Sequence, residues 1–287
     1  LMLSRLQCIQ NNIPNQLKIW IKIMKPLYQA CVSVNFRLRR NVDKEILPDV
    51  LVIALLCWQF EIGMTNQSRY YRFLKLNFIP ILPEESRFNR ICNRDGVLLE
   101  IIREYLLITR VRPVYSIIDS FPMPLCKHVR INRSHDMKPY SNIGFNSTKG
   151  LYYFGLKANF QVSNQGIALS YSITPASIAD VKVAKTLIES YPTKYTLADE
   201  GYISKPLHDF LLKTMNVNLW TPTKSNMTPH CYDERPLRRL RRQIETTFSK
   251  WELSFDIEHN RGRCLEGYHT RIEQALLTDT IKKLRTN

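Results

Sequence analysis

Three acidic residues have the types and positions needed for metal-assisted chemistry: Asp119, Asp199 and Glu245. Asp119 ends an apolar run, YSIID, that is typical of a buried strand, and Asp199 ends a second such run, YTLAD. Glu245 lies inside a long helical pattern, RRQIETTFSKW. Carboxylates that converge repel one another unless a cation neutralises them, and oxygen ligands suit Mg²⁺ or Mn²⁺. A pair of such ions, roughly 3.5 to 4 Å apart, promotes the attack of water or a 3′-hydroxyl on a phosphodiester.

Each of these acids also has a plainer interpretation. Asp119 is of a type that often ends strands by bonding to the backbone of the following turn. Glu200 follows Asp199 directly and points to the opposite face of a strand, so that spacing alone does not choose between the two. Glu245 follows Arg241 by four residues, which is the spacing of an ordinary surface ion pair on a helix. These alternatives remain open on the residues alone.

The composition favours a nucleic-acid partner. The 287 residues carry 41 Lys and Arg against 25 Asp and Glu, a net charge of +16. Such a balance indicates a polyanionic partner, for which DNA is the first candidate and an anionic membrane surface the competitor. The basic residues are spread through core-forming segments and do not line one amphipathic helix, which disfavours the membrane surface.

The cysteines and the apolar runs bear on the compartment. Seven cysteines are scattered and never spaced as C-x-x-C, which predicts a reduced, cytoplasmic setting. The longest uncharged apolar run, VLVIALLCWQF at 50–60, is too short to cross a bilayer, so no membrane partner is expected.

Up to residue 111 the periodicity is helical, which predicts an all-helical N-terminal region. Two basic faces repeat at helical spacing within it: Arg69, Arg72 and Lys75, then Arg87, Arg90 and Arg94. They are either phosphate-binding faces or the solvated faces of ordinary helices.

After Pro113 strands alternate with helices. Strands are predicted at 114–120, 151–163, 166–174, 194–202 and 217–223, and helices at 177–191, 205–216, 236–251 and 265–285. An antiparallel meander followed by a crossover predicts a mixed α/β sheet with helices on its faces. The first strand and the strand after the crossover can then be neighbours, which would bring Asp119 and Asp199 together. A helix packed across that edge would supply Glu245.

The segments SIIDSFP, YYFGLKANF, LADEGY and RRQIETTFSKW together resemble the DDE transposases of bacterial insertion sequences, over about residues 113–255. The sequence is most similar to the group named after insertion sequence nine-eighty-two, and SRFNRIC resembles the N-terminal region of that group. The resemblance implies an RNase H-like core in which Asp119, Asp199 and Glu245 hold two Mg²⁺ or Mn²⁺ ions. It also favours Asp199 over Glu200.

Related groups carry a Y-x2-R-x3-E-x6-K pattern around the glutamate. In this sequence the arginine is Arg241, whereas the tyrosine position holds Arg238 and the lysine position holds Glu252. The residues expected to contact DNA phosphates are Arg238, Arg241, Arg242, Lys149 and Lys157.

We therefore expect a DNA-binding helical region at 1–111, an RNase H-like catalytic core at 112–256, and a C-terminal helical extension at 257–287 that packs on the core. The expected function is a transposase that nicks transposon ends and transfers the 3′-hydroxyl into target DNA, working as a homodimer on double-stranded DNA. The alternatives are an RNase H-like nuclease without strand transfer and an inactive DNA-binding protein.

Overall fold

The computed structural model describes residues 13–286 except 41, 43–44, 135–136, 139, 147–149, 229 and 263. The chain forms two compact units. Unit 1 contains the chain up to Val111, Ser254–Asp256 and the segment from Arg261 onward, and unit 2 contains Arg112–Leu253 and Ile257–Asn260. Among the described helices, none is both long enough and apolar enough to cross a bilayer.

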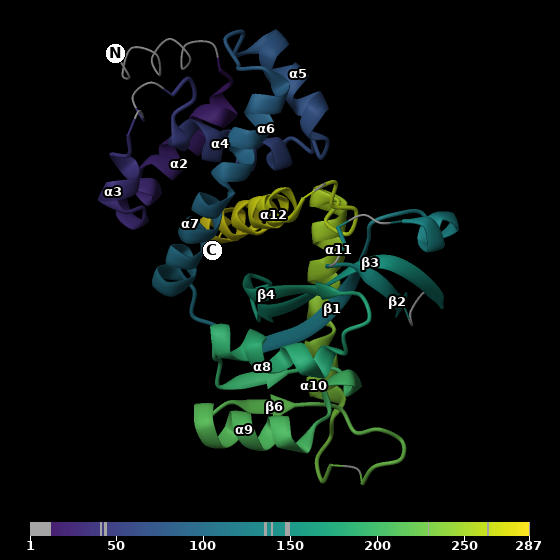
Figure 1. The fold of residues 1–287 in the computed structure, drawn as a ribbon. Coiled ribbons are helices and arrows are strands. Elements are labelled where there is room, and N and C mark those ends of the chain that lie inside the picture. Colours follow the sequence, from purple (N-terminus) through teal and green to yellow (C-terminus); the bar gives the residue numbers. More distant parts are fainter. Residues whose placement is uncertain are drawn as a thin grey trace. The chain divides into compact units, whose positions relative to one another are not determined.

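Unit 1 is helical (Figure 1). Its helices are α2 (Asn15–Cys31), α3 (Val34–Arg37), α4 (Asp49–Glu61), α5 (Gln67–Asn77), α6 (Glu85–Arg94), α7 (Gly96–Arg110) and α12 (Leu265–Thr286). The apolar segment at 50–60 forms most of α4, and every residue from Leu51 to Phe60 is buried. A helix that is apolar all round must be enclosed by other helices, and α2, α7 and α12 pack around α4.

The C-terminal segment differs from its expected packing. We expected residues 257–287 to pack on the catalytic core, whereas α12 packs against α4 and α7 within unit 1. Leu277 and Ile281 of α12 belong to the same apolar core as Leu51 and Leu98. The physical reason is that α4 is apolar on every side, so α4 and α7 would expose an apolar surface to water if α12 did not cover it.

Unit 2 is a six-stranded mixed sheet with helices on both faces (Figure 1). Its strands are β1 (Ser116–Pro124), β2 (Asn142–Asn146), β3 (Leu151–Ser163), β4 (Ala168–Pro175), β5 (Tyr195–Leu197) and β6 (Asn218–Trp220). Its helices are η2 (His128–Arg133), α8 (Asp180–Ser190), η3 (Glu200–Tyr202), α9 (Lys205–Met215), α10 (Arg235–Arg241) and α11 (Gln243–Phe255), of which α11 belongs to this unit up to Leu253.

The strand order confirms the expected fold class, an RNase H-like mixed sheet after a helical N-terminal region. Strands β1, β3 and β4 form an antiparallel meander, and β5 and β6 follow parallel to β1, in the order β2-β3-β1-β5-β6 with β4 paired to β3. The meander turns at Gly166, whose φ of +76° suits glycine. Ile118 and Ala184 lie in the core beneath α8 and α9, and aromatic rings from α11 cover the other face.

Three elements of unit 2 differ from the sequence-based expectation. Strand β1 continues to Pro124, so that Asp119 lies within the strand and does not end it. The parallel neighbour β5 pairs only with Ser116 and Ile117, and the rest of that edge of β1 is open, where strand prolines are tolerated. Strand β2 lies between the predicted strands at 114–120 and 151–163, where no strand was predicted. A turn at Arg242 divides the helix predicted at 236–251 into α10 and α11.

One buried ion pair joins two helices of unit 1. Arg103 on α7 donates to both carboxylate oxygens of Glu273 on α12, with Nε–Oε2 at 2.7 Å and Nη2–Oε1 at 2.9 Å. The two side chains are only 4% and 0% exposed. A charge in such a place is tolerated because its partner is fixed opposite it.

Replacement of Glu273 by Gln should therefore leave the guanidinium of Arg103 buried without its counter-charge. We expect the free energy of unfolding, measured by urea titration with circular dichroism, to fall by about 3–5 kcal/mol. The exposed Glu84, which forms no ion pair within the described part of the chain, provides the control Glu84→Gln. Equal stability of the two variants would contradict a structural role of the pair.

Candidate metal centre at the open edge of β1

The parallel pairing of β1 with β5 sets Asp119 and Asp199 at the same level of the sheet. Ser116 pairs with Thr196, and Ile117 pairs with Leu197. Asp119 comes two residues after Ile117, and Asp199 comes two residues after Leu197. Because side chains alternate between the two faces of a sheet, both aspartates are expected on the same face as this last pair. Asp199 is extended, with φ −83° and ψ 173°, and precedes η3. The expected convergence of these two carboxylates is thus set by strand register.

Aromatic packing brings the helix of Glu245 to the same face of the sheet. Phe121 of β1 contacts Phe248 of α11 with ring centroids 4.9 Å apart, and Phe160 of β3 contacts Trp251 at 5.1 Å. Asp119 and Phe121 are two residues apart on one strand and therefore point to the same face. Glu245 lies in the first turn of this helix, and its side chain is 54% exposed.

The guanidinium of Arg241 links two of the three acids. Its Nη1 lies 3.4 Å from Asp119 Oδ2, and its Nη2 donates to Glu245 Oε1 at 3.0 Å. The Arg241 side chain is only 17% exposed. The ion pair that the helical spacing predicts for Glu245 is therefore present, and the same cation also faces the strand carboxylate.

Asp119 is the electrostatically strained member of the group. Burial raises the pKa of its carboxyl group to about 7, against the opposing effects of the Ser120 backbone N–H and Arg241, and the charges of Asp199 and Asp180 raise the pKa further. The Ser120 N–H donates to Asp119 Oδ1 at 2.8 Å. An ionised Asp119 therefore needs more positive charge than Arg241 supplies.

A fourth carboxylate, Asp180, approaches β1 from the opposite face. Its Oδ1 accepts from Ser120 Oγ at 3.0 Å and from Lys157 Nζ at 2.8 Å. Its Oδ2 lies 3.8 Å from the position that a Cβ on Gly201 would take, beside η3. Asp180 was not among the acids predicted from the sequence. It lies in the first turn of α8, where an acidic residue is ordinary at the beginning of a helix.

A tyrosine hydroxyl completes the polar surroundings. Tyr202 of η3 is 1% exposed, and among the described residues its hydroxyl has no hydrogen-bond partner. Burial raises its pKa, and the charges of Asp180, Asp119 and Asp199 add to this effect. A buried hydroxyl without a partner costs free energy unless a ligand or water meets it. The candidate metal ligands at this site are thus all oxygen atoms, from the carboxylates and this hydroxyl. Such a set of ligands fits a hard divalent cation.

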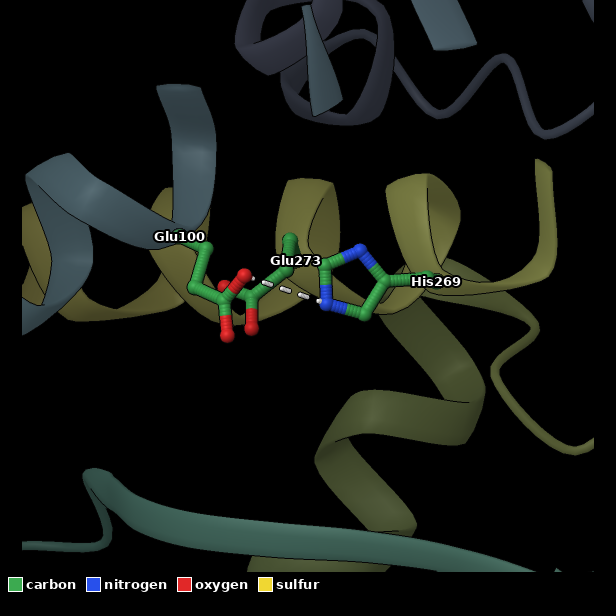
Figure 2. Close-up of side chains that lie close together, drawn as sticks. All are labelled: Glu100, His269 and Glu273. Atoms are coloured by element: carbon green, nitrogen blue, oxygen red, sulfur yellow. Dashed lines mark ion pairs between the residues drawn. The ribbon is translucent and has the colours of Figure 1, made fainter. Parts of the chain in front are cut away.

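The ligand atoms of the three acids are not yet gathered to metal-binding distance. Among the described residues, the ligand atoms of Asp119, Asp199 and Glu245 do not all lie within 4.8 Å of one another. Those of Glu100, His269 and Glu273 in unit 1 do, and Figure 2 shows these side chains pointing toward one another. Because Arg241 bonds to both Asp119 and Glu245, Glu245 would have to turn from Arg241 to join the strand acids. Its exposure on a first helical turn permits that rotation.

The acids of the Glu100 group in unit 1 already have partners within the protein. His269 Nε2 lies 3.4 Å from Glu100 Oε2, an ion pair when the imidazole is protonated, and Glu273 is bound through both oxygens by Arg103. Burial raises the pKa of Glu100, and the charge of Glu273 adds to this effect. This group joins α7 to α12.

The expected DNA-binding residues have different surroundings. Arg238 is paired with Glu234 at 2.7 Å, Lys157 is 16% exposed and paired with Asp180, and Arg241 lies between the acids. Arg242 is exposed and has no ion pair within the described ranges. Lys149 lies outside the described residues. DNA contact by each of these residues stays a prediction.

The raised pKa of Asp119 predicts a pH-dependent effect of its removal. The pKa of an aspartate in the unfolded chain is about 3.9, whereas that of Asp119 in the folded protein is about 7. Between these two pH values Asp119 therefore binds its proton more tightly in the folded state than in the unfolded state. The unfolding free energy of the wild type should therefore fall as the pH rises through this window. In EDTA, Asp119→Asn should be more stable than the wild type at pH 8 by about 1–3 kcal/mol and nearly equal to it at pH 4.

Urea unfolding at the two pH values measures this effect. The control is Asp209→Asn, which changes an exposed aspartate of α9 in the same unit. A stability difference for Asp119→Asn that does not change between pH 4 and pH 8 would contradict the electrostatic strain.

Comparison with known proteins identifies the family of this chain. A family model described as "Transposase DDE domain" matches residues 112–265, more than half of the chain. No curated protein matches the sequence. One similar solved structure is the "Crystal structure of the Mos1 Strand Transfer Complex", at 10% identity over 82% of this chain and 96% of that chain. Its TM-score of 0.21 is too low to support an argument. The family match alone shows that this chain belongs to the transposase DDE domain family.

Proposed function

We propose that the protein is a DNA transposase that nicks the ends of a transposon and transfers the freed 3′-hydroxyl into target DNA. The observation that carries the proposal is the placement of Asp119, Asp199 and Glu245 around the open edge of β1, within the segment that matches the family. The net charge of +16 supports a DNA substrate. Assignment to the nine-eighty-two group stays a prediction.

Each acid has a distinct role in this proposal. Asp119 and Asp199 follow paired strand positions and provide fixed carboxylates, whereas Glu245 provides a movable one on α11. Two Mg²⁺ or Mn²⁺ ions, when bound, would activate the attacking oxygen and stabilise the leaving oxygen. Arg241 holds Glu245 before binding and can turn its guanidinium to a DNA phosphate afterwards.

The surface arginines position the DNA without reading its sequence. Arg242 is exposed and has no ion pair in the described part of the chain, so it can bind phosphate without first breaking an internal contact. Arg238 and Lys157 would have to exchange Glu234 and Asp180 for phosphate. Because both transposon ends must be processed together, we propose that a homodimer forms on the DNA.

Supercoiled plasmid nicking tests the metal centre. Asp119→Asn, Asp199→Asn and Glu245→Gln should each lower the Mg²⁺-dependent nicking rate by about 100-fold or more, because losing a metal ligand forfeits several kcal/mol of transition-state stabilisation. Glu200→Gln changes the acid next to Asp199 and should retain most of the activity. Equal Mg²⁺-dependent nicking by wild type and Asp119→Asn would refute the site, whereas the absence of nicking by the wild type would favour an inactive DNA-binding protein.

Strand transfer separates a transposase from a nuclease of the same fold. The substrate is a duplex that ends in the inverted repeats bracketing the gene, incubated with a target plasmid and Mg²⁺. A transposase should covalently join the duplex to the plasmid through its 3′ end. Nicking of the plasmid without any joined product, or a gene that no inverted repeats flank, would favour the nuclease.

A further inference from the structure

Helix α6 is anchored by a narrow apolar edge. Within Glu85–Arg94 only Phe88 and Cys92 are buried, at 0% and 3% exposure. Phe88 packs on the ring of Tyr71 with centroids 5.6 Å apart, and Cys92 Sγ accepts from Gln67 Nε2 at 3.5 Å. The exposed side of this helix carries Ser86, Arg87, Arg90 and Arg94.

The exposed side of α6 carries side chains of a type that can recognise bases. Ser86, Arg87 and Arg90 are exposed, whereas Asn89 and Asn93 are partly exposed and lie toward α12, with the Asn93 amide beside Gly267. Arginine forms paired hydrogen bonds with guanine and asparagine with adenine in the major groove. Arg87 and Arg90 form no ion pair anywhere in the described residues, so their guanidinium groups are available to a partner.

The third arginine of this face has a different task. Arg94 donates to Glu45 at 2.8 Å and to Asp95 at 2.6 Å, and also lies 3.5 Å from Asp49. These contacts fix the C-terminal end of α6 to the beginning of α4. Arg94 is thus held by ion pairs within unit 1, whereas Arg87 and Arg90 on the same helix form none in the described residues.

The surroundings of α6 leave room for a ligand on both sides. A hollow of about 450 Å³ is lined on one side by Arg87, Arg90 and Arg94. Another, of about 490 Å³, is lined on the other side by Asn89 and Asn93. The Oδ1 atom of Asn89 is buried there without a hydrogen-bond partner among the described residues. The helix is therefore a ridge between two hollows, a shape that suits insertion into a groove.

The other basic helices of unit 1 lack this combination. On α5, the side chain of Asn66 caps the helix by accepting from the Arg69 N–H, and the neighbouring Leu76 is 83% exposed. The exposed face of α2 carries lysines, which bind phosphate as point charges. Such faces strengthen binding to any sequence.

We propose that α6 reads base edges in the major groove of double-stranded DNA, with Arg87 and Arg90 as the residues that determine sequence specificity. This inference rests on the proposed function, because it names the part of the chain that recognises the DNA on which the metal centre acts.

Selection from a pool of random double-stranded DNA, with the full-length chain, tests the inference. The wild type should enrich a defined motif. Arg87→Ala/Arg90→Ala should lower the ratio of affinities for the enriched duplex and its scrambled version by about 10-fold or more for each arginine lost. Arg87→Lys/Arg90→Lys keeps the charge and the solvated surface but loses the paired hydrogen bonds, and should show a similar loss of ratio.

The matched control is Arg69→Ala/Arg72→Ala, which removes the same charge from α5. It should weaken binding to both duplexes equally and leave the motif unchanged.

An unchanged affinity ratio in both α6 variants, or a lost ratio in the α5 control alone, would overturn the assignment. A wild type that nicks DNA but enriches no motif would overturn this inference only. A wild type that enriches a motif but does not nick with Mg²⁺ would overturn the proposed function and leave the inference standing.

Discussion

The cost of holding carboxylates close together in partly buried surroundings governs the architecture of the site. Asp119 is fixed within a strand, and burial together with Asp199 and Asp180 raises its pKa to about 7. The chain offsets this cost with one shared cation, Arg241, which also holds Glu245. The arrangement is thus incomplete by itself and favours the binding of further positive charge.

The rest of unit 2 sets the positions of these charges. The parallel pairing of β1 with β5 aligns the two aspartates, and the early end of that pairing leaves the edge of β1 beside Asp119 open. Phe248 and Trp251 hold α11 against the sheet with fixed ring contacts. Asp180 and Lys157 form their own pair across β1, so that this fourth carboxylate is neutralised without Arg241. Strand pairing and aromatic packing therefore fix the backbone positions of Asp119, Asp199 and Glu245.

The chain uses its many arginines in two ways. Some are internal counter-charges, such as Arg103 opposite Glu273 and Arg94 opposite Glu45 and Asp95. Others, such as Arg87, Arg90 and Arg242, are exposed and form no ion pair in the described part of the molecule. Only the second kind could bind an anionic partner without first breaking an internal contact. The net charge of +16 therefore does not by itself give the charge of any one face of the molecule.

Local patterns were enough to predict most of the helices and strands and the mixed sheet, because periodicity and strand ends are encoded over a few neighbouring residues. The assignment of Asp119, Asp199 and Glu245 as metal ligands needed the family resemblance as well, and it stays a prediction. Contacts between distant segments were beyond such patterns: the continuation of β1 past Asp119, the packing of α12 in unit 1, and the pairing of Lys157 with Asp180. By itself, the sequence determined which residues carry charge. Only the tertiary structure decided which charges are neutralised, because ion pairs depend on distances that close when the chain folds.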